Sequence, residues 1–503
     1  MRNSSLLILM NLALLFCGCK CTAKDIRALE PGTFYSAEYA SQRYFFQLDS
    51  LSEDRMSGCF YHVSGSSAPR HEFSAKLHRR KLSLESEDTK IVIKLRKLSL
   101  EGYSAPEFSL SDTTLFQDPG AKVIEERDIV YGKAQGYWTS LPGVEAEISK
   151  AITDGYLKSF KKRDLPLTLD LYRPEGALSP RPLILFIHGG AFYIGDKREP
   201  AYVDFCTHFA SMGYVTASMN YRMGFHLGKG ELERAEYAAL QDAAAALRYL
   251  VAHSEEYGID ADRIFLAGSS AGSITALSAA FATDKERPDA SFGDGGLIKR
   301  DDMGPIQSSG NNLKNKYSIL AVANMWGAVS SEEMLRNSRT DIVSFHGEED
   351  HVVPFGEGYP FSDVNEIITK LLAEPMYGSA CIDSVASELG LRTKFYPFPG
   401  QGHAFNVSGP EKKPNDFHTV IRSRIGRFFY EEMVPSEALV EASGDGLYRI
   451  LGNVAQVSWK ADGGFILEAG EDWVRVLWRG DVSDRTLTAS GTYPCGSGFV
   501  VRY

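Results

Sequence analysis

Residues 268–272 read Gly-Ser-Ser-Ala-Gly, a G-x-S-x-G pattern that is short enough to arise by chance. The flanking residues make it informative. The short apolar run Ile264–Ala267 precedes it, and the small-residue run Ser273–Ala280, typical of a helix, follows it. Strand, sharp turn and helix form the geometry that lifts a serine hydroxyl clear of a sheet. The helix N-terminus adds positive potential beside that hydroxyl. The sequence therefore predicts Ser270 as a nucleophile.

A serine nucleophile of this kind needs a base, and the base needs an orienting acid. With this turn geometry, both follow the serine in the chain, and the acid comes before the histidine. His403 lies in a glycine-rich loop that follows a strand-like run starting at Lys394, where a base is needed. His418 falls in the helix-like stretch Asp416–Phe429, so we expect it at the surface. We predict His403 as the base.

The acid is expected just after a strand and a turn that lie between the serine and the histidine. Asp350 follows the strand-like run Ile342–Phe345 in this way. Glu348 and Glu349 are close rivals because they lie in the same turn. We predict Asp350 as the acid that orients His403.

A second glycine-rich segment, residues 188–192, follows the continuous apolar run Leu183–Ile187. Acyl transfer creates an oxyanion that needs preorganised N–H donors, and glycine-rich backbone can supply them. The donors we expect are the backbone N–H groups of Gly190, Ala191 and Ala271. A plain turn is the alternative interpretation of the glycines, and His188 is expected to close this loop rather than to act as a base.

Residues 165–405 resemble the α/β-hydrolase carboxylesterase and lipase family with an HGG-type oxyanion motif. The motifs that carry this resemblance are Leu169–Pro174, Ile187–Lys197, Asn220–Arg222, Gln241–Ala244, Gly258–Asp260, Gly268–Gly272, the Asp350 run and Gly402–Phe405. One departure is Ala191, where many relatives carry a third glycine, but its backbone N–H remains available.

The resemblance implies an α/β fold with a doubly wound, mainly parallel sheet. It also implies serine ester hydrolysis through an acyl-enzyme, without a metal or organic cofactor. Within this family the chain is similar to feruloyl and acetyl-xylan esterases, so the expected substrate is an ester of a small molecule or of a polysaccharide.

Three other interpretations stay open. A serine exopeptidase of the prolyl-oligopeptidase type shares the triad order, but its propeller would not fit in the short N-terminal β segment. A non-catalytic binding protein on the same fold typically loses a triad member, and here all three are present. A metal site would use His346, Glu348, Asp350 and His351, although the serine constellation already accounts for Asp350.

Two sets of aromatic residues have two readings each. The first set flanks the predicted site and could line an acyl pocket or belong to the core: Phe192, Tyr193, Trp326 and Phe405. The second lies near the C-terminus and could form a carbohydrate-binding platform or a β-sandwich core: Trp459, Trp473 and Trp478.

The pattern of residue types along the chain predicts three folded parts. Residues 25–120 carry aromatic and β-branched runs such as Tyr44–Leu48, which indicate a small antiparallel sheet or partial barrel. Residues 122–435 alternate strand-like runs with helical stretches such as Glu231–Glu256, as a doubly wound α/β domain does. Residues 438–503 are again β-rich and resemble a PKD-like or immunoglobulin-like sandwich module.

The first 21 residues have the features of a secretory leader. A positive start at Met1-Arg2 precedes the apolar run Leu6–Phe16, which is too short to span a bilayer comfortably. Gly18 before Cys19 resembles a bacterial lipoprotein signal, in which Cys19 would be lipidated. We expect an exported protein, either secreted or held at the cell envelope with a lipid anchor in a membrane.

Composition limits the remaining function classes. The 503 residues carry 65 acidic and 54 basic groups, a net charge of −11, which gives no support for a nucleic-acid partner. Hydrophobic residues make up 44% and charged residues 24%, as in ordinary globular protein, so long disorder and a multi-pass membrane protein are disfavoured. Seven cysteines are too few for a disulfide scaffold in a chain of this length. The four beyond the leader allow three pairings, and their spacing selects none.

Overall fold

The computed structural model describes strands between residues 34 and 100, and then residues 115–140, 161–177, 180–226, 228–293, 300–363, 369–370, 373–409, 411–434 and 436–503. Two compact units divide the chain. One comprises residues 114–435, and the other comprises residues 1–113 together with residues 436–503.

The unit of residues 114–435 is built on an eight-stranded sheet of order β19-β16-β14-β13-β11-β12-β10-β9. Its strands, in chain order, are β9 Val123–Gly136, β10 Arg163–Pro174, β11 Arg181–Ile187, β12 Val215–Met219, β13 Ile259–Ser269, β14 Ile319–Met325, β16 Asp341–Gly347 and β19 Thr393–Phe398. β10 runs antiparallel to both of its neighbours, β9 and β12, and the other adjacent pairs are parallel.

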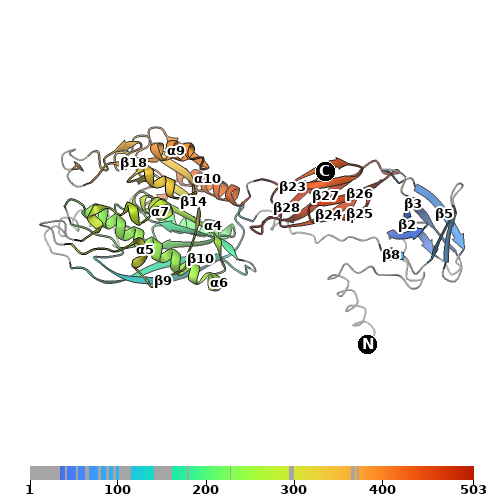
Figure 1. Ribbon diagram of the computed structural model, residues 1–503, viewed down its shortest axis with the longest axis horizontal. Coiled ribbons are helices and arrows are strands. Elements are labelled where there is room, and N and C mark those ends of the chain that lie inside the picture. The colour runs from blue at the N-terminus through green and yellow to red at the C-terminus, as the bar shows by residue number, and fades with distance from the viewer. Residues whose placement is uncertain are drawn as a thin grey trace, which may run out of the picture. The chain divides into compact units, whose positions relative to one another are not determined.

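Helices cover both faces of this sheet (Figure 1). They are α4 Pro200–Ser211, α5 Glu231–Ala252, α6 Ser254–Tyr257, α7 Ala271–Phe281, α9 Ser379–Glu388 and α10 Asp416–Met433. Short 3-10 turns join them: η3 Asp284–Glu286, η4 Asp289–Ser291, η5 Ile306–Ser308 and η6 Glu332–Asn337. Two small sheets complete the unit. One has three strands, β15 Ala328–Val329, β18 Met376–Gly378 and β17 Glu357–Gly358. The other has two strands, β20 Val407–Ser408 and β21 Lys413–Pro414.

The sequence of β11 explains why the sheet is covered on both sides. Side chains alternate between the two faces of a strand, and here both sets are fully buried. Leu183, Leu185 and Ile187 join the hydrophobic cluster that contains residues of α5 and α7. Phe186, on the opposite face, stacks on Phe205 of α4 with ring centroids 5.4 Å apart. A continuous apolar run is the pattern of such a doubly covered strand.

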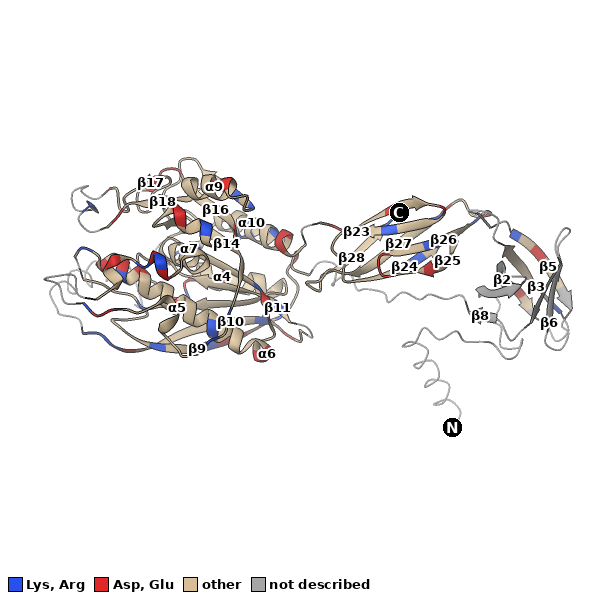
Figure 2. Ribbon diagram, viewed as in Figure 1, with Lys and Arg blue, Asp and Glu red and all other residues tan. Residues whose placement is uncertain are grey.

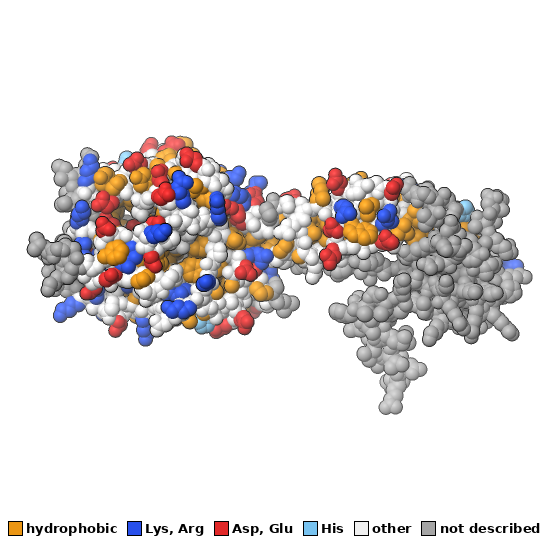
Figure 3. All heavy atoms as spheres, in the orientation of Figure 1, with side chains coloured by type: hydrophobic (Ala, Val, Ile, Leu, Met, Phe, Trp, Pro, Cys, Tyr) orange, Lys and Arg blue, Asp and Glu red, His pale blue; other side chains and the backbone are white. Residues whose placement is uncertain are grey.

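The large, mainly parallel sheet with helices on both faces fits the α/β-hydrolase fold that the resemblance implied. The charged side chains of this unit are of both signs (Figure 2), and they intermingle on the face shown in Figure 3. Within the described residues, no helix combines the length and apolarity needed to cross a membrane.

The second unit is built from β strands. Its N-terminal part contains the sheet β5-β3-β2-β1-β8 and the β6-β7 pair. The bounds are β1 Phe34–Tyr39, β2 Gln42–Leu51, β3 Arg55–His62, β4 Ser67–Ala68, β5 Arg70–Lys76, β6 Lys81–Glu85, β7 Lys90–Lys94 and β8 Leu98–Leu100. Neighbouring strands of the five-stranded sheet pair antiparallel.

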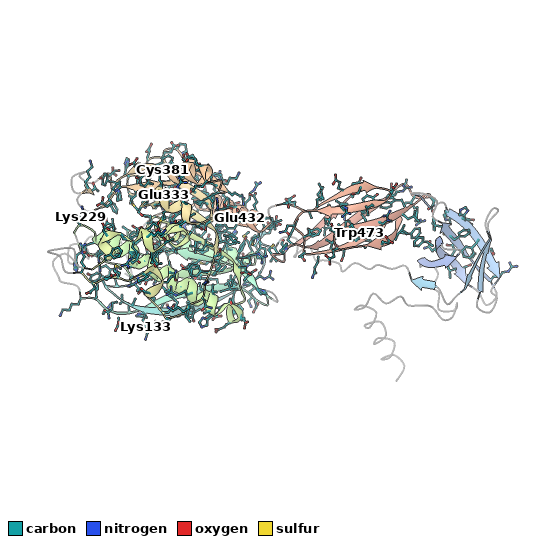
Figure 4. The ribbon with its side chains drawn as sticks, viewed as in Figure 1. Lys133, Lys229, Glu333, Cys381, Glu432 and Trp473 are labelled. Carbon is teal, nitrogen blue, oxygen red and sulfur yellow. The ribbon has the colours of Figure 1, made fainter. Side chains whose placement is uncertain are left out.

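The C-terminal part holds two further sheets, β22-β23-β26-β25 and β24-β27-β28. The bounds are β22 Leu439–Gly444, β23 Leu447–Leu451, β24 Gln456–Asp462, β25 Gly464–Ala469, β26 Trp473–Arg479, β27 Thr486–Thr492 and β28 Gly498–Arg502. Two sheets of this kind are compatible with the predicted sandwich. Trp459 of β24 is fully buried, as a core residue would be. Trp473, labelled in Figure 4, and Trp478 are five residues apart on β26, so they point to opposite faces and the three tryptophans cannot form one platform.

Residues from both ends of the chain share a hydrophobic cluster. Phe45 of β2 stacks on Phe465 of β25 with ring centroids 4.2 Å apart, and Tyr61 and Leu477 belong to the same cluster. β4 also pairs with β26. The segments 25–120 and 438–503, which the sequence predicted as separate domains, therefore contact each other within one unit. No disulfide bond joins any two of the four described cysteines, Cys59, Cys206, Cys381 and Cys495.

Candidate active site

Ser270 stands in the turn between β13 and α7. Its φ is +54° and its ψ is −125°, a sparsely populated conformation that costs about 1–3 kcal/mol for a residue with a side chain. The Ser270 N–H donates to the carbonyl of Met325 on β14 over 2.9 Å, which holds the turn against the sheet. A Cβ at Gly272 would lie 2.0 Å from the carbonyl oxygen of Ile187, so only glycine fits where α7 crosses β11. The turn therefore depends on glycine for its close packing.

Asp350, His403 and Ser270 form one hydrogen-bonded chain. His403 Nε2 lies 2.9 Å from Ser270 Oγ, and His403 Nδ1 lies 2.7 Å from Asp350 Oδ2. Asp350 comes from the loop after β16, and His403 from the loop after β19. These loops follow neighbouring parallel strands, whose carboxyl ends lie at the same edge of the sheet. The structure thus brings together the three residues that the sequence predicted separately.

The Asp350 carboxylate is held in its ionised form. Its Oδ1 accepts the backbone N–H groups of Val352 and Val353 at 2.8 and 3.0 Å. Burial opposes ionisation, but hydrogen bonds from His346, His403 and the Val353 N–H together keep the pKa of Asp350 well below its ordinary value. An ionised carboxylate at this position fixes the His403 tautomer that has its proton on Nδ1 and leaves Nε2 free to accept the Ser270 proton.

A second, fully buried histidine supports this acid. His346 Nε2 lies 3.3 Å from Asp350 Oδ2, and its Nδ1 lies 2.7 Å from Ser379 Oγ. Asn324 Nδ2 donates to Ser379 Oγ at 3.0 Å, and Asn324 Oδ1 accepts from Ser273 Oγ at 2.6 Å. The chain of hydrogen bonds runs from the acid loop to α7, the helix that begins beside Ser270.

The role of His346 as a support of Asp350 was not predicted from the sequence, nor were the roles of Asn324 and Ser379. One available signal was Asn324 itself, a polar residue near the end of the otherwise apolar β14. Within the described residues, no group of three His, Cys, Asp or Glu side chains is placed to hold a metal ion.

The loop after β11 presents unused backbone donors. Three successive residues have positive φ: Gly190 at +113°, Ala191 at +53° and Phe192 at +57°. The carbonyl of Gly190 accepts the N–H groups of Tyr193 and Ile194, which closes the loop. Within the described part of the chain, the N–H groups of Gly190, Ala191 and Ala271 donate to no acceptor. Ala271 is the first residue of α7, where helix N–H groups have no partner within the helix.

Two tyrosine side chains hold this loop in place through hydrogen bonds. Tyr202 OH accepts the Gly189 N–H at 3.0 Å and lies 2.6 Å from Ser269 Oγ. Tyr221 OH donates to the carbonyl of His188 at 2.8 Å. His188 itself is fully buried, and burial lowers its pKa, so its ring stays neutral. The structure places His188 in the loop support and away from the Ser270–His403 pair, as the sequence indicated.

A buried ion pair anchors the segment that carries Tyr221. Arg222 Nη2 lies 2.7 Å from Asp242 Oδ1, and the Arg222 N–H donates to Asp242 Oδ2 at 2.7 Å. The Asp242 side chain is completely buried and the Arg222 side chain is 10% exposed. Removing one partner of such a pair leaves the other charge buried without compensation.

We expect Asp242→Asn to lower the free energy of unfolding by about 3–5 kcal/mol, because it leaves the Arg222 guanidinium unpaired. Urea denaturation followed by circular dichroism measures this change. The matched control is Glu175→Gln, which breaks the exposed pair with Lys122 and should cost under about 1 kcal/mol. Equal effects of the two substitutions would contradict the prediction.

Ser270 borders two cavities. The larger has a volume of about 390 Å³ and is lined by His403, Trp326 and polar side chains that include Glu199, Asn406 and Lys412. The smaller has a volume of about 70 Å³. It is lined by Ala271, by apolar side chains that include Phe192, Leu232, Ile274 and Met376, and by Glu233 and Glu236. Of the four aromatic residues predicted near the site, Phe192 lines the smaller cavity and Trp326 the larger, whereas Tyr193 and Phe405 line neither.

Glu236 of α5 lies in a site unfavourable to its charge. Burial and the neighbouring Glu233 raise its pKa to about 7, although Ser278 donates a hydrogen bond to it. The folded state therefore binds a proton more tightly than the unfolded state. Stability from this proton is fully present below pH 4.5 and is lost as the pH rises through 7.

We expect Glu236→Gln to stabilise the protein at pH 8 and to change its stability by under about 1 kcal/mol at pH 5, because glutamine stays neutral at both. The gain at pH 8 is at most about 3 kcal/mol, since each pKa unit corresponds to about 1.4 kcal/mol. Thermal unfolding of both proteins at the two pH values measures it. A gain that does not depend on pH would contradict the prediction.

One histidine lies elsewhere than the sequence predicted. His418 was expected at the surface of α10, but it is only 1% exposed. Its Nε2 lies 2.9 Å from Asp204 Oδ2, and its ring packs on Phe205 of α4. The packing of α10 against α4 buries it, and that packing is not visible in the local helix pattern.

The predicted leader 1–21 and the lipidation site Cys19 lie outside the described residues.

Comparisons with known proteins find esterase-like similarity over part of the chain. The BD-FAE family model matches residues 169–363. Gut esterase 1 of Caenorhabditis elegans is 34% identical over 111 residues, which cover 22% of this chain and 20% of that protein. Para-nitrobenzyl esterase of Bacillus subtilis is 34% identical over 118 residues, which cover 22% of this chain and 24% of that protein. The matched stretch thus spans about a fifth to a quarter of these curated relatives.

Among solved structures, an esterase of Thermogutta terrifontis with bound propionate is 21% identical, with a TM-score of 0.36 over 53% of this chain and 90% of that one. A truncated carbohydrate esterase from gut microbiota is 19% identical, with a TM-score of 0.35 over 63% of this chain and 98% of that one.

Proposed function

We propose that this protein is a carboxylesterase that hydrolyses carboxylic esters through an acyl-enzyme on Ser270. The observation that carries the proposal is the hydrogen-bonded chain from Asp350 through His403 to Ser270, next to a loop with unused N–H donors. The similarity of residues 169–363 to the BD-FAE family model and the partial matches to curated esterases support the same reaction class.

The first half-reaction acylates the serine. Ser270 Oγ attacks the ester carbonyl carbon while its proton moves to His403 Nε2, which accepts it across the 2.9 Å hydrogen bond. The carbonyl oxygen becomes an oxyanion, which accepts hydrogen bonds from the N–H groups of Gly190, Ala191 and Ala271. The ionised Asp350 stabilises the His403 imidazolium. The carbon–oxygen bond to the alcohol then breaks, and the alcohol leaves with the proton from His403.

The second half-reaction releases the acid. Water takes the place of the alcohol and gives one proton to His403 as its oxygen attacks the acyl carbon. The bond to Ser270 Oγ breaks, the proton returns to Oγ, and the carboxylic acid leaves. None of these steps requires a cofactor, because the protein supplies the nucleophile, the base and the oxyanion donors.

Hydrolysis of a substrate panel by the purified mature protein tests the proposal. The panel contains p-nitrophenyl acetate, butyrate and octanoate, methyl ferulate, acetylated xylan and alanyl-prolyl p-nitroanilide, each with and without a serine-directed organophosphate. We expect cleavage of the esters that the organophosphate abolishes. Cleavage of the anilide alone would favour the exopeptidase, and no cleavage at all would favour the binding protein.

We also propose that the protein is exported and anchored by a lipid on Cys19, which the leader-like composition of residues 1–21 supports. Metabolic labelling with radioactive palmitate tests this proposal. The label should enter the full chain and should be absent from the Cys19→Ala variant. Labelling of both proteins, or of neither, would overturn the anchor.

A further inference from the structure

The position of His403 distinguishes the two cavities that meet at Ser270. In the proposed reaction, the proton on His403 Nε2 goes to the leaving alcohol, so the alcohol must lie beside this ring. His403 lines the larger cavity and does not line the smaller one. The alcohol therefore belongs in the larger cavity, and the acyl group extends into the smaller one.

The acyl cavity has an unusual charge for a site with apolar walls. Glu233 and Glu236, both on α5, line it together with Glu374, and no Lys or Arg is among its described lining residues. The Oε2 atom of Glu233 is buried and has no hydrogen-bond partner within the described part of the chain. Both glutamates of α5 have raised pKa values, chiefly because burial disfavours their charged forms. Neutral groups would suffice to fill an apolar pocket, so the carboxylates need another explanation.

A nearby cation does not remove this negative charge. Lys229 Nζ lies 3.8 Å from Glu374, and both side chains are highly exposed. Figure 4 shows Lys229 at the outer edge of the α/β unit. This exposed pair is screened by solvent, and the attraction of Lys229 lowers the pKa of Glu233 less than burial raises it.

We infer that Glu233 and Glu236 are specificity-determining residues that make the acyl cavity reject acyl groups carrying a negative charge. This inference rests on the proposed esterase function. A carboxylate on the acyl group would enter a small, weakly hydrated cavity beside two glutamates. Repulsion between like charges is strong where water is scarce. Uncharged acyl groups of similar size meet no such repulsion.

Two ethyl esters that differ in one charge test the inference. Ethyl hydrogen succinate and ethyl levulinate have acyl groups of nearly the same shape. The succinate ester ends in a carboxylate, and in the levulinate ester a methyl group replaces one oxygen of that carboxylate. Their hydrolysis is followed in a pH-stat at pH 8, where Glu236 is ionised. For the wild-type protein, we expect kcat/KM to be at least about tenfold lower for the succinate ester.

Glu233→Gln and Glu236→Gln, made separately and together, remove the charge while keeping the shape of the side chain. In the double variant, the two esters should differ by less than about threefold, with the change arising from faster hydrolysis of the succinate ester. Glu175→Gln, which removes an exposed charge on the α/β unit, is the matched control and should leave the wild-type ratio unchanged.

Equal hydrolysis of the two esters by the wild-type protein would overturn the inference and leave the esterase function intact. An unchanged preference in the double variant would overturn the role of these two residues. If neither ester nor p-nitrophenyl acetate were hydrolysed, the proposed esterase function would be wrong, and so would this inference.

Discussion

Replacing Ser270 by alanine is expected to lower kcat for p-nitrophenyl acetate by about 10⁵–10⁶-fold, because no other group can form the acyl-enzyme. The oxyanion donors and the cavities remain, so a residual rate above that of water alone should persist. Stopped assays with wild-type and variant proteins at equal concentration measure the ratio. Circular dichroism should show an unchanged fold, since the loss is a single oxygen atom.

Ser269→Ala is the matched control for this experiment. Ser269 is the adjacent serine, but its Oγ lies 2.6 Å from Tyr202 OH and takes no part in the chain to His403. We expect its kcat to fall by less than about tenfold, since one neutral hydrogen bond contributes only about 1 kcal/mol. Near-wild-type turnover by Ser270→Ala would remove the proposed mechanism altogether.

Replacing Asp350 by asparagine is expected to lower kcat by about 10⁴-fold. The amide group can no longer hold His403 in the tautomer with its proton on Nδ1, nor stabilise the imidazolium. The amide oxygen can still accept the Val352 and Val353 N–H groups, so these two hydrogen bonds are weakened rather than lost. The expected result is therefore a loss of kcat with a smaller change in stability, measured by steady-state kinetics and thermal unfolding.

Two neighbouring residues provide the controls. Glu348 and Glu349 lie in the same turn and are exposed, whereas the Asp350 side chain is completely buried. Glu348→Gln and Glu349→Gln should each retain activity within about threefold of wild type, because both side chains are exposed and the carboxylate bonded to His403 is that of Asp350. A loss of 10³-fold or more in either control would show that the acid had been assigned to the wrong residue.

Much of the site could be predicted from the sequence because its signals are local. The serine, the acid and the histidine each follow a short strand, and their chain order is set by the topology of the sheet. The glycine-rich loop after β11 could be recognised for the same reason. Each of these signals lies within about ten residues of the side chain that it predicts.

Features that depend on packing between distant elements could not be predicted in this way. His418 is buried by α4, more than 200 residues earlier in the chain, so its helix gives no local sign of burial. The support of Asp350 by His346, Ser379 and Asn324 joins three separate elements. Glu233 and Glu236 are polar residues of a long helix, and the other walls of the cavity that they line come from distant residues such as Val353, Phe361 and Met376.

The shared hydrophobic cluster of the β unit has a consequence for biosynthesis. Residues 114–435 are contiguous, so the α/β unit can fold as soon as it has left the ribosome. Phe45 and Tyr61, in contrast, must wait for Phe465 and Leu477, which are synthesised about 400 residues later. At roughly 5–20 residues per second, this delay lasts roughly 20–80 s. During that interval, a nascent chain with a complete catalytic unit still exposes aromatic strands, which makes those strands the segment of this protein that most needs a chaperone.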